Sequence, residues 1–133
     1  MEDFEAHQLL KRAWAVRANA AVRGNRRVGA SVLASNGQIY VGCNIQQKYH
    51  IGDVHAEVAA ITAMVSMGGS KFSAIVVVSD GDGVPPCGAC RDWILQFGAP
   101  DCIVLWCGEN DGSSNQLPAR DLMPYPPSFM PFP

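Results

Sequence analysis

The sequence predicts an α/β domain in which helices cover the faces of a β-sheet. Segments with helical spacing of apolar residues alternate along the chain with strand-like segments. A near-continuous apolar run, Ala74-Ile75-Val76-Val77-Val78, is typical of a central strand that is covered on both faces. Strands that are followed by helices and further strands build a layered sheet with helices packed on it. At 133 residues, the chain suits one domain, 1–133, that can bury a core.

The N-terminal part predicts a helix and a β-hairpin. Residues 2 to about 22 carry apolar side chains at helical spacing, and Gly24 is expected to end this helix. Val28–Ala34 is expected to form a strand, and Gln38–Asn44 returns beside it with alternating apolar residues. Ser35-Asn36-Gly37 predicts the turn between them, because Asn and Gly tolerate a positive φ.

The rest of the chain predicts further helices and strands before an irregular tail. In order, these segments are a loop at 45–53, a helix from Val54 to about Met67, a strand at Phe72–Ser79, a loop at 80–86, a helix at Cys87–Phe97, a strand at Cys102–Cys107, a polar loop at 108–116, a helical turn at Arg120–Met123 and a tail at 124–133. Asp53 is placed to cap the second helix. Gly98 and Pro100 are expected to close the third helix.

Composition and charge exclude several classes of protein. Hydrophobic residues make up 48% of the chain and charged residues 17%, a balance that argues against disorder. The formal net charge of -2 does not favour a nucleic-acid partner. No stretch approaches the roughly 20 apolar residues of a membrane span, and the acidic N-terminus does not resemble a secretion signal. We therefore expect a cytoplasmic protein without a membrane partner, whose five cysteines stay reduced.

Two short motifs carry metal-binding side chains. His55-Ala56-Glu57 stands at the expected start of the second helix, and Pro86-Cys87-Gly88-Ala89-Cys90 stands at the start of the third. In Cys-x-x-Cys at a helix start, the two thiols lie about one turn apart and can converge on one ion. The free N–H groups and the dipole of that helix end stabilise the thiolate form that binds metal. With His55 as a third ligand, the fourth position of a zinc ion stays open, which is typical of a catalytic site.

Glu57, two residues after His55, is expected beside the metal without binding it. Zinc lowers the pKa of a bound water to around neutrality. A carboxylate beside that water can take its proton and later deliver it to a leaving group. His-x-Glu combined with Pro-Cys-x-x-Cys is the signature of zinc-dependent nucleobase deaminases. We therefore predict a hydrolytic deaminase in which Glu57 moves the protons.

Together, the motifs resemble the cytidine deaminase superfamily, and specifically its short, single-domain members. The matching segments extend over nearly the whole chain and are Val28-Gly29-Ala30, Gly42-Cys43-Asn44-Ile45, Ser79-Asp80, Pro86 to Arg91 and Leu122-Met123-Pro124. The resemblance implies a three-layer fold with a mixed five-stranded sheet between helices. It also implies a homo-oligomer, a tetramer rather than a dimer, with sites at the subunit contacts. There Phe129 or Phe132 would stack on the base in a neighbouring site.

The resemblance also implies roles for individual residues. Zn²⁺ would be the cofactor, held by His55, Cys87 and Cys90, and Glu57 would be the proton shuttle. Arg91 would lie behind the thiolates and moderate their charge. The remaining substrate contacts that it implies are backbone groups at Ala56 and Ser79, which would read the pyrimidine edge, and Asn44, which would contact the sugar.

Three departures from the family pattern surround the metal motif. His55 stands where the short tetrameric members have Cys, which removes one negative charge from the site. Gln46 replaces the Glu that holds a ribose hydroxyl, so this contact becomes neutral. An aromatic wall becomes basic and polar at 23–26. This basic segment is either a solvated loop or a contact for a small polar or anionic ligand, in which Arg26 could receive a carboxylate or phosphate.

Several functions stay open on this basis. The first is hydrolytic deamination of cytidine or deoxycytidine to the uridine product, with release of ammonia. The second is deamination of a modified cytosine nucleoside or another amino-heterocycle, because the blasticidin S deaminase type also departs from the ribose-binding motif. A non-catalytic zinc-stabilised binding module is a third, which Glu57 argues against, since a structural site has no use for that carboxylate. A polynucleotide substrate is disfavoured by the acidic balance and by the lack of an aromatic-rich basic groove.

Overall fold

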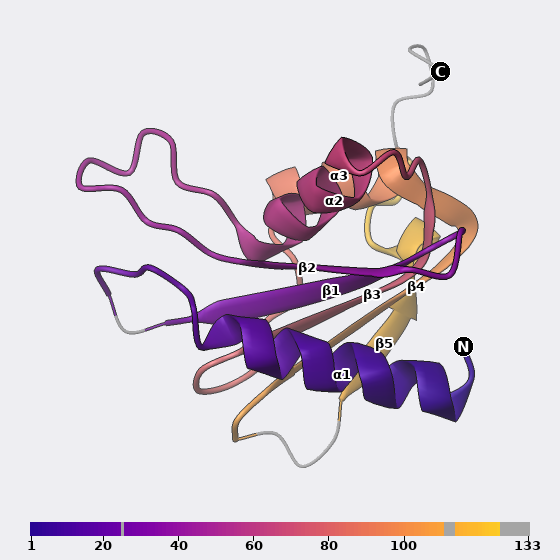
Figure 1. Ribbon diagram of the computed structural model, residues 1–133, viewed down its shortest axis with the longest axis horizontal. Coiled ribbons are helices and arrows are strands. Elements are labelled where there is room, and N and C mark those ends of the chain that lie inside the picture. Colours follow the sequence, from indigo (N-terminus) through magenta and orange to yellow (C-terminus); the bar gives the residue numbers. More distant parts are fainter. Residues whose placement is uncertain (25, 111–113, 126–133) are drawn as a thin grey trace.

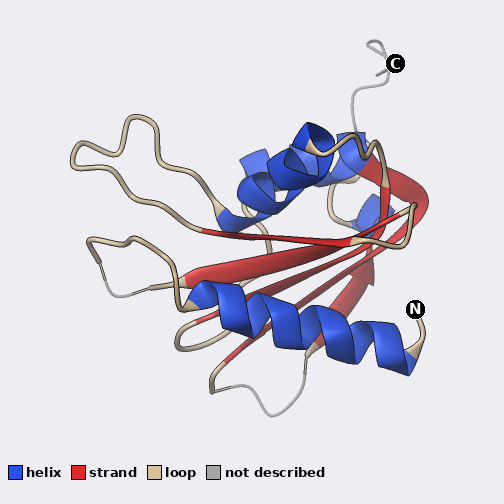
Figure 2. Cartoon of the chain, viewed as in Figure 1, coloured by secondary structure: helices blue, strands red, loops and turns tan. Residues whose placement is uncertain are grey.

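The computed structural model of the chain describes residues 1–24, 26–110 and 114–125. Within these residues, it contains three α-helices, one short 3₁₀ helix and one five-stranded sheet. The sheet forms a middle layer, with α1 on one face and with α2 and α3 on the other (Figures 1 and 2). The predicted α/β fold, a mixed five-stranded sheet between helices, is therefore confirmed.

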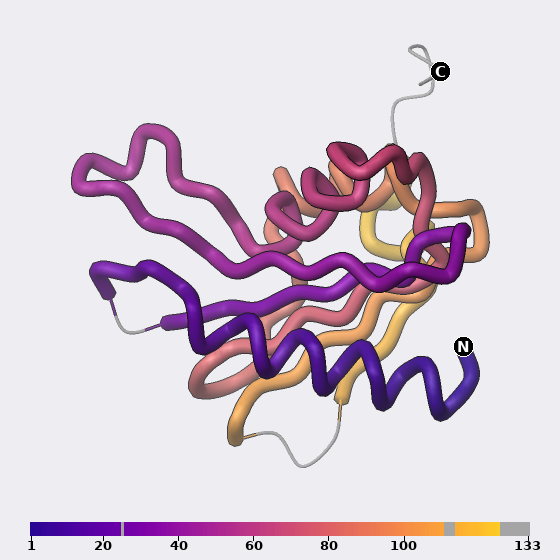
Figure 3. Tube along the Cα trace, in the orientation of Figure 1, coloured from indigo at the N-terminus to yellow at the C-terminus, as the bar shows by residue number. Residues whose placement is uncertain are grey.

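The elements follow one another in the predicted alternation, and the path of the chain can be traced in Figure 3. The helices are α1 (Asp3–Arg17), α2 (Ala56–Ser66), α3 (Gly88–Phe97) and the 3₁₀ helix η1 (Ala119–Asp121). The strands are β1 (Val28–Ala34), β2 (Ile39–Cys43), β3 (Phe72–Ser79), β4 (Gly98–Gly108) and β5 (Asn115–Pro118). They lie in the order β2-β1-β3-β4-β5. β1 is antiparallel to β2 and to β3, β3 is parallel to β4, and β5 is antiparallel to β4.

β3 lies at the centre of the core, as its apolar run predicts. Ile75 and Val77 belong to the cluster of buried side chains that includes residues of α2 and α3. Val76 and Val78 belong to a second cluster on the opposite face, where Leu9 of α1 packs. Alternate residues of one strand therefore bind the two helical layers together, because successive side chains point to opposite faces of a sheet.

The N-termini of α2 and α3 meet at one edge of the sheet. β2 and β3 are both antiparallel to β1, so they run in the same direction and their carboxyl ends lie at the same edge. The chain leaves each of these strands through a loop and then begins α2 or α3. In α/β sheets, ligands bind beside the carboxyl ends of the strands, where the following helices begin. The topology thus brings the two metal-binding motifs to one place.

α1 is shorter than predicted, because it ends at Arg17 rather than near residue 22. Beyond the helix, the Ala21 N–H donates to the Asn44 carbonyl at 3.2 Å, and the Ala21 carbonyl accepts from the Gln46 N–H at 2.8 Å. These bonds to the segment after β2 replace the helical pattern that the apolar spacing favours. None of the helices in the described part of the chain has the length and apolarity that a bilayer crossing requires.

Two local predictions at the termini of elements were wrong. Asp53 does not cap α2, whose N-cap is His55; the Asp53 carboxylate accepts instead from the Gln47 N–H at 2.6 Å. β5 begins at Asn115, within the segment predicted as a polar loop, and pairs with β4. Its four residues show no apolar alternation, and its Pro118 is tolerated because β5 is an edge strand.

A substitution at Gly42 of β2 tests how closely this strand approaches α2. A Cβ atom at Gly42 would press on the backbone of Ala59 and Ala60, and would lie 2.6 Å from the Ala59 carbonyl carbon. Gly42→Ala is expected to lower the free energy of unfolding by about 1–3 kcal/mol in urea denaturation, because the packed backbone has to shift. Gly24→Ala is the matched control, since a Cβ there meets nothing within 4 Å. Equal unfolding midpoints for the two variants would contradict the close approach.

Candidate active site

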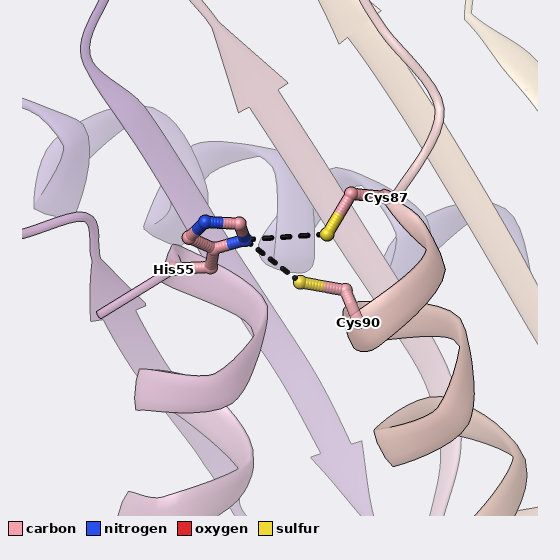
Figure 4. A group of neighbouring side chains, drawn as sticks. All are labelled: His55, Cys87 and Cys90. Atoms are coloured by element: carbon pink, nitrogen blue, oxygen red, sulfur yellow. Dashed lines mark hydrogen bonds between the residues drawn. The ribbon is translucent and has the colours of Figure 1, made fainter. Parts of the chain in front are cut away.

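Three metal-binding side chains converge where α2 and α3 begin (Figure 4). His55 is the N-cap of α2, Cys87 is the N-cap of α3, and Cys90 lies in the first turn of α3. His55 Nδ1 lies 3.3 Å from the Sγ atom of Cys87 and 3.3 Å from that of Cys90. The three donor atoms all lie within 4.8 Å of one another. The predicted association of the two motifs is therefore present in the fold.

The electrostatics of this cluster favour a bound cation. Burial raises the pKa of the Cys90 thiol, and the negative charge of Glu57 and a hydrogen bond with Cys87 raise it further. A thiolate at Cys90 therefore needs a positive charge beside it. Each N-cap side chain lacks a capping hydrogen bond of its own, so two helix N-termini direct their positive dipole ends toward the cluster.

The donor set fits zinc. One imidazole nitrogen and two thiolate sulfurs are ligands that Zn²⁺ binds in tetrahedral sites. Cys90 is fully buried, whereas His55 and Cys87 are exposed, so the site opens to solvent on one side. Three protein donors with an open side match the arrangement of catalytic zinc sites, in which the fourth position takes water or substrate.

Glu57 lies in the first turn of α2 and belongs to the same site. Its side chain is only 6% exposed, although Glu is rarely buried without a partner or a function. Its charge acts on the Cys90 thiol, which places the carboxylate beside the metal-binding cluster. A buried carboxylate beside an open metal position is suited to proton transfer.

A cavity of about 200 Å³ extends from this cluster. Its wall includes the following residues: Val28, Asn44, Ile45, Gln46, Asp53, Val54, His55, Ala56, Glu57, Val77, Val84, Pro85 and Cys87. The wall therefore combines the carboxylate of Glu57, two of the three candidate metal donors and several apolar side chains. Such a mixture is typical of a pocket that binds a small, flat, partly polar molecule.

The comparison with protein families agrees with this site. Residues 4–106 match the family described as the cytidine and deoxycytidylate deaminase zinc-binding region. The chain belongs to this family. Its zinc-binding character agrees with the convergence of His55, Cys87 and Cys90.

The matches with individual relatives differ in how much of this chain and how much of the relative they cover. A cytidine deaminase of Sporosarcina psychrophila is 46% identical over 71 residues, which is 53% of this chain and 52% of that protein. The match therefore spans about half the length of this relative. A cytidine deaminase of Halalkalibacterium halodurans is 32% identical over 123 residues, which is 91% of this chain and 92% of the relative. The crystal structure of cytidine deaminase from Burkholderia pseudomallei superposes with a TM-score of 0.84 at 29% identity, and covers 94% of this chain and 98% of that one.

Three predicted substrate contacts line the cavity, namely Asn44, Gln46 and Ala56. The Asn44 side chain is engaged with the segment before β1, because its Oδ1 accepts from the Val28 N–H at 2.8 Å and its Nδ2 donates to the Arg26 carbonyl at 3.1 Å. Gln46 Oε1 accepts hydrogen bonds from the backbone N–H groups of Arg23 and Gly24. Ala56 is the first residue of α2 and is fully buried.

Two other predicted contacts lie away from the cavity wall. The Arg26 guanidinium donates to the Asp82 carbonyl at 2.9 Å and to Ser79 Oγ at 3.3 Å. Ser79 is buried at the end of β3, and its hydroxyl donates to the same Asp82 carbonyl at 3.2 Å. The basic segment thus holds the loop that leads from β3 to α3. Phe129 lies outside the described residues.

Arg91 acts on the backbone around the metal cluster. Its Nε donates to the Pro86 carbonyl at 2.8 Å, and its Nη1 donates to the Leu122 carbonyl at 2.8 Å. These bonds tie the residue before Cys87 to the segment after η1. The contacts of Arg91 therefore orient the start of α3, and the effect of its charge on the thiolates stays a prediction.

Asp80 connects several parts of the fold, although no chemical motif in the sequence marks it. Its Oδ2 accepts from the Nε of Arg27 at 3.0 Å and from the Arg27 N–H at 3.1 Å, and its Oδ1 pairs with Arg17 of α1. Asp80 directly follows β3, in the loop that carries Val84 and Pro85 to the cavity wall. The carboxylate therefore ties that loop to α1 and to the basic segment. Its signal in the sequence was only a position after a strand in a family motif.

Metal analysis of cysteine variants tests the zinc site. The purified chain is expected to hold about one zinc per chain, and Cys90→Ser is expected to hold less than a tenth of that amount, because a buried donor is lost. Cys102→Ser is the matched control, since Cys102 is equally buried but lies in β4. Inductively coupled plasma mass spectrometry on both proteins gives the answer. Full zinc content in Cys90→Ser would remove this residue from the ligand set.

The pH dependence of stability tests the role of Asp80. Burial raises the pKa of this carboxyl, but the hydrogen bonds and charge of Arg27, with the charge of Arg17, outweigh that effect and hold the pKa below its ordinary value of 3.8. Ionised Asp80 therefore stabilises the folded state fully above the ordinary pKa of 3.8. This contribution is lost as the pH falls through the lower pKa of the folded state. Asp80→Asn is expected to lower the free energy of unfolding by about 1–3 kcal/mol at neutral pH, with a smaller difference in acid.

Urea denaturation between neutral pH and acid measures this difference. Asp92→Asn serves as control, because Asp92 is exposed on α3 and has no ion pair within the described residues. A constant difference between Asp80→Asn and the native chain at every pH would show that its ionisation does not contribute.

Proposed function

We propose that this chain is a zinc-dependent hydrolytic deaminase of cytidine or deoxycytidine. The observation that carries the proposal is the convergence of His55, Cys87 and Cys90 beside the buried carboxylate of Glu57. The reaction consumes one water and releases one ammonia, and it converts the cytosine base to uracil. The relatives named cytidine deaminase support this choice of substrate.

The chain's own residues account for the proton transfers. When bound, zinc lowers the pKa of a water in its open coordination position to around neutrality. In the proposed mechanism, Glu57 accepts a proton from the attacking water and passes it to the ring nitrogen beside the reacting carbon. It then takes the remaining proton of the former water, which is now a hydroxyl on the reacting carbon, and delivers it to the departing amino group, so that the carbonyl forms and ammonia leaves. Burial keeps the carboxylate away from bulk water during both transfers.

The cavity supports a base-sized substrate. Its volume of about 200 Å³ suits one pyrimidine with part of a sugar, and its apolar wall at Val54, Val77 and Val84 suits the faces of a flat ring. We propose that the main-chain groups at Ala56 read the edge of the base and that Asn44 contacts the sugar. Residues 1–133 would then act as one catalytic domain.

A modified cytosine nucleoside or another amino-heterocycle is the second candidate substrate. The specific observation in its favour is Gln46, whose side-chain oxygen is already bonded to two backbone N–H groups of the protein. A plain ribose hydroxyl therefore finds no carboxylate at this position. A non-catalytic zinc module is disfavoured, because it would leave the buried Glu57 without a purpose.

We also propose that the chain acts as a cytoplasmic homo-oligomer, with a tetramer favoured over a dimer. α2 supports self-association, because its outer face is nearly uncharged and leaves apolar side chains in solvent. Val65 is 44% exposed and Met67 is 74% exposed. These two apolar side chains, one in the last turn of α2 and one at its C-cap, support a contact with another subunit at this end of the helix.

Glu57→Gln tests the proposed chemistry. It is expected to lower kcat for cytidine by at least about 100-fold, because an amide cannot accept and return the protons. Zinc content is expected to stay at the native level, since Glu57 is not in the proposed ligand set. The decrease in cytidine absorbance measures the rate, and metal analysis of the same sample checks the site. Native turnover in Glu57→Gln, or no turnover of any cytosine nucleoside by the zinc-loaded native chain, would refute the proposal.

A further inference from the structure

Arg26 is a fixed cation that forms no ion pair with any residue that the structure describes. Its Nη1 donates to the Asp82 carbonyl at 2.9 Å and to Ser79 Oγ at 3.3 Å. Both of these acceptors are neutral. They therefore hold the guanidinium in place without balancing its positive charge.

The contacts of Arg26 place its guanidinium next to the apolar side of the metal-binding cavity. Three apolar wall residues mark this side, namely Val28, Val77 and Val84. Arg26 lies two positions before the first of them, and its partners Ser79 and Asp82 lie two positions from the other two. Ser79 and Val77 point to the same face of β3, because side chains alternate along a strand. The guanidinium therefore lies just outside the cavity, at its rim.

The hydrogen bonds of Arg26 leave one edge of its guanidinium available. Both bonds come from Nη1, whereas Nε and Nη2 have no partner within residues 1–24, 26–110 and 114–125. The N–H groups of Nε and Nη2 share one edge and can donate two parallel hydrogen bonds to a carboxylate or phosphate. The edge that matches an anion is thus the one that the protein does not use.

The neighbouring carboxylates are engaged elsewhere. A second cavity of about 340 Å³ lies beside Arg26, and its wall is formed by Arg26, Arg27, Asp80, Gly81 and Glu109. Asp80 and Glu109 both pair with Arg17, which reduces the repulsion that an incoming anion would meet. The Asp82 carboxylate accepts from a side-chain amide in the loop after β4 at 3.2 Å. The open edge of Arg26 therefore has space beside it and no carboxylate bonded to it.

We propose that Arg26 binds an anionic group, a carboxylate or a phosphate, on the sugar part of the substrate. The inference rests on the proposed deaminase function and extends it from cytidine to cytosine nucleosides that carry such a group. In cytosine, the nitrogen that bears the sugar lies across the ring from the reacting carbon. The sugar therefore points away from the metal donors and toward the rim, where two parallel bonds from Arg26 both bind and orient its anionic group.

Cytidine and its anionic derivatives measure this preference. The compounds are cytidine, its 2′-, 3′- and 5′-phosphates, and the 5′-carboxylate in which the 5′ carbon is oxidised. The native chain is expected to deaminate at least one anionic compound with a kcat/KM about tenfold or more above that of cytidine, because two charge-assisted hydrogen bonds are added. The compound with the highest kcat/KM shows whether the group is a phosphate or a carboxylate.

Arg26→Gln removes both the charge and the paired donors. The ratio of kcat/KM for the preferred anionic compound to that for cytidine is expected to fall about tenfold or more, mainly through KM, because Arg26 does not touch the reacting atoms. Division by the value for cytidine cancels any general loss that a weakened loop causes. Arg23→Gln is the matched control, since it removes the same charge from an exposed position in the same segment. Its ratio is expected to stay within about twofold of the native ratio, because exposed charges are screened by salt.

Arg26→Lys is a second variant that keeps the charge and can keep a bond to the loop. A lysine offers a point charge in place of two parallel donors, so the ratio is expected to fall about threefold. A native preference for cytidine over every anionic compound would overturn this inference alone, as would an unchanged ratio in both Arg26 variants. Absence of turnover across the whole series in zinc-loaded native protein would overturn the proposed function and, with it, the inference.

Discussion

The buried sulfur of Cys90 imposes the constraint on which the rest of the site depends. The Cys90 sulfur and the carboxylate of Glu57 lie together in the interior, where a thiolate and a carboxylate would repel each other strongly because water cannot screen them. Such a pair is tolerable only where positive charge is supplied. The fold supplies part of it by starting two helices at this point, and the histidine donor adds no further negative charge. A divalent cation among the three donors balances what remains.

Helix α1, on the opposite face of the sheet from α2 and α3, also helps to hold the metal-binding cluster in place. Asp80 connects Arg17 of α1 with the segment before β1 and with the loop that leads to Cys87. The loop that carries Val84 and Cys87 is therefore held by an ion cluster with two cations, and one of them, Arg17, lies on the opposite helix layer. Arg91 fixes the same loop from its other end through the Pro86 carbonyl. The start of α3 is thus held from two sides, which gives its thiols a defined position.

Features that repeat or combine along the chain were predictable from the sequence, whereas single contacts were not. The apolar run of β3 and the motifs around His55 and Cys87 predicted the layers and the metal cluster, because periodicity and ligand spacing are encoded locally. The end of α1 depends on bonds from Ala21 to a segment more than 20 residues away, so helical spacing overestimates its length. β5 has no apolar face and forms by pairing with β4 alone. The partners of Arg26 and Asp53 likewise depend on loops whose paths no local pattern determines.

The polar residues of the cavity wall are constrained in two different ways. His55, Cys87 and Cys90 offer donor atoms for a metal ion, and few residue types can supply such donors. Gln46 is a neutral amide on the cavity wall, and two backbone N–H groups hold its orientation. A change in the loop at Arg23 and Gly24 could therefore rotate the amide and exchange donor for acceptor without any substitution in the cavity wall. The orientation of this polar group thus depends on a loop outside the cavity wall, whereas the candidate metal donors are held by the starts of α2 and α3.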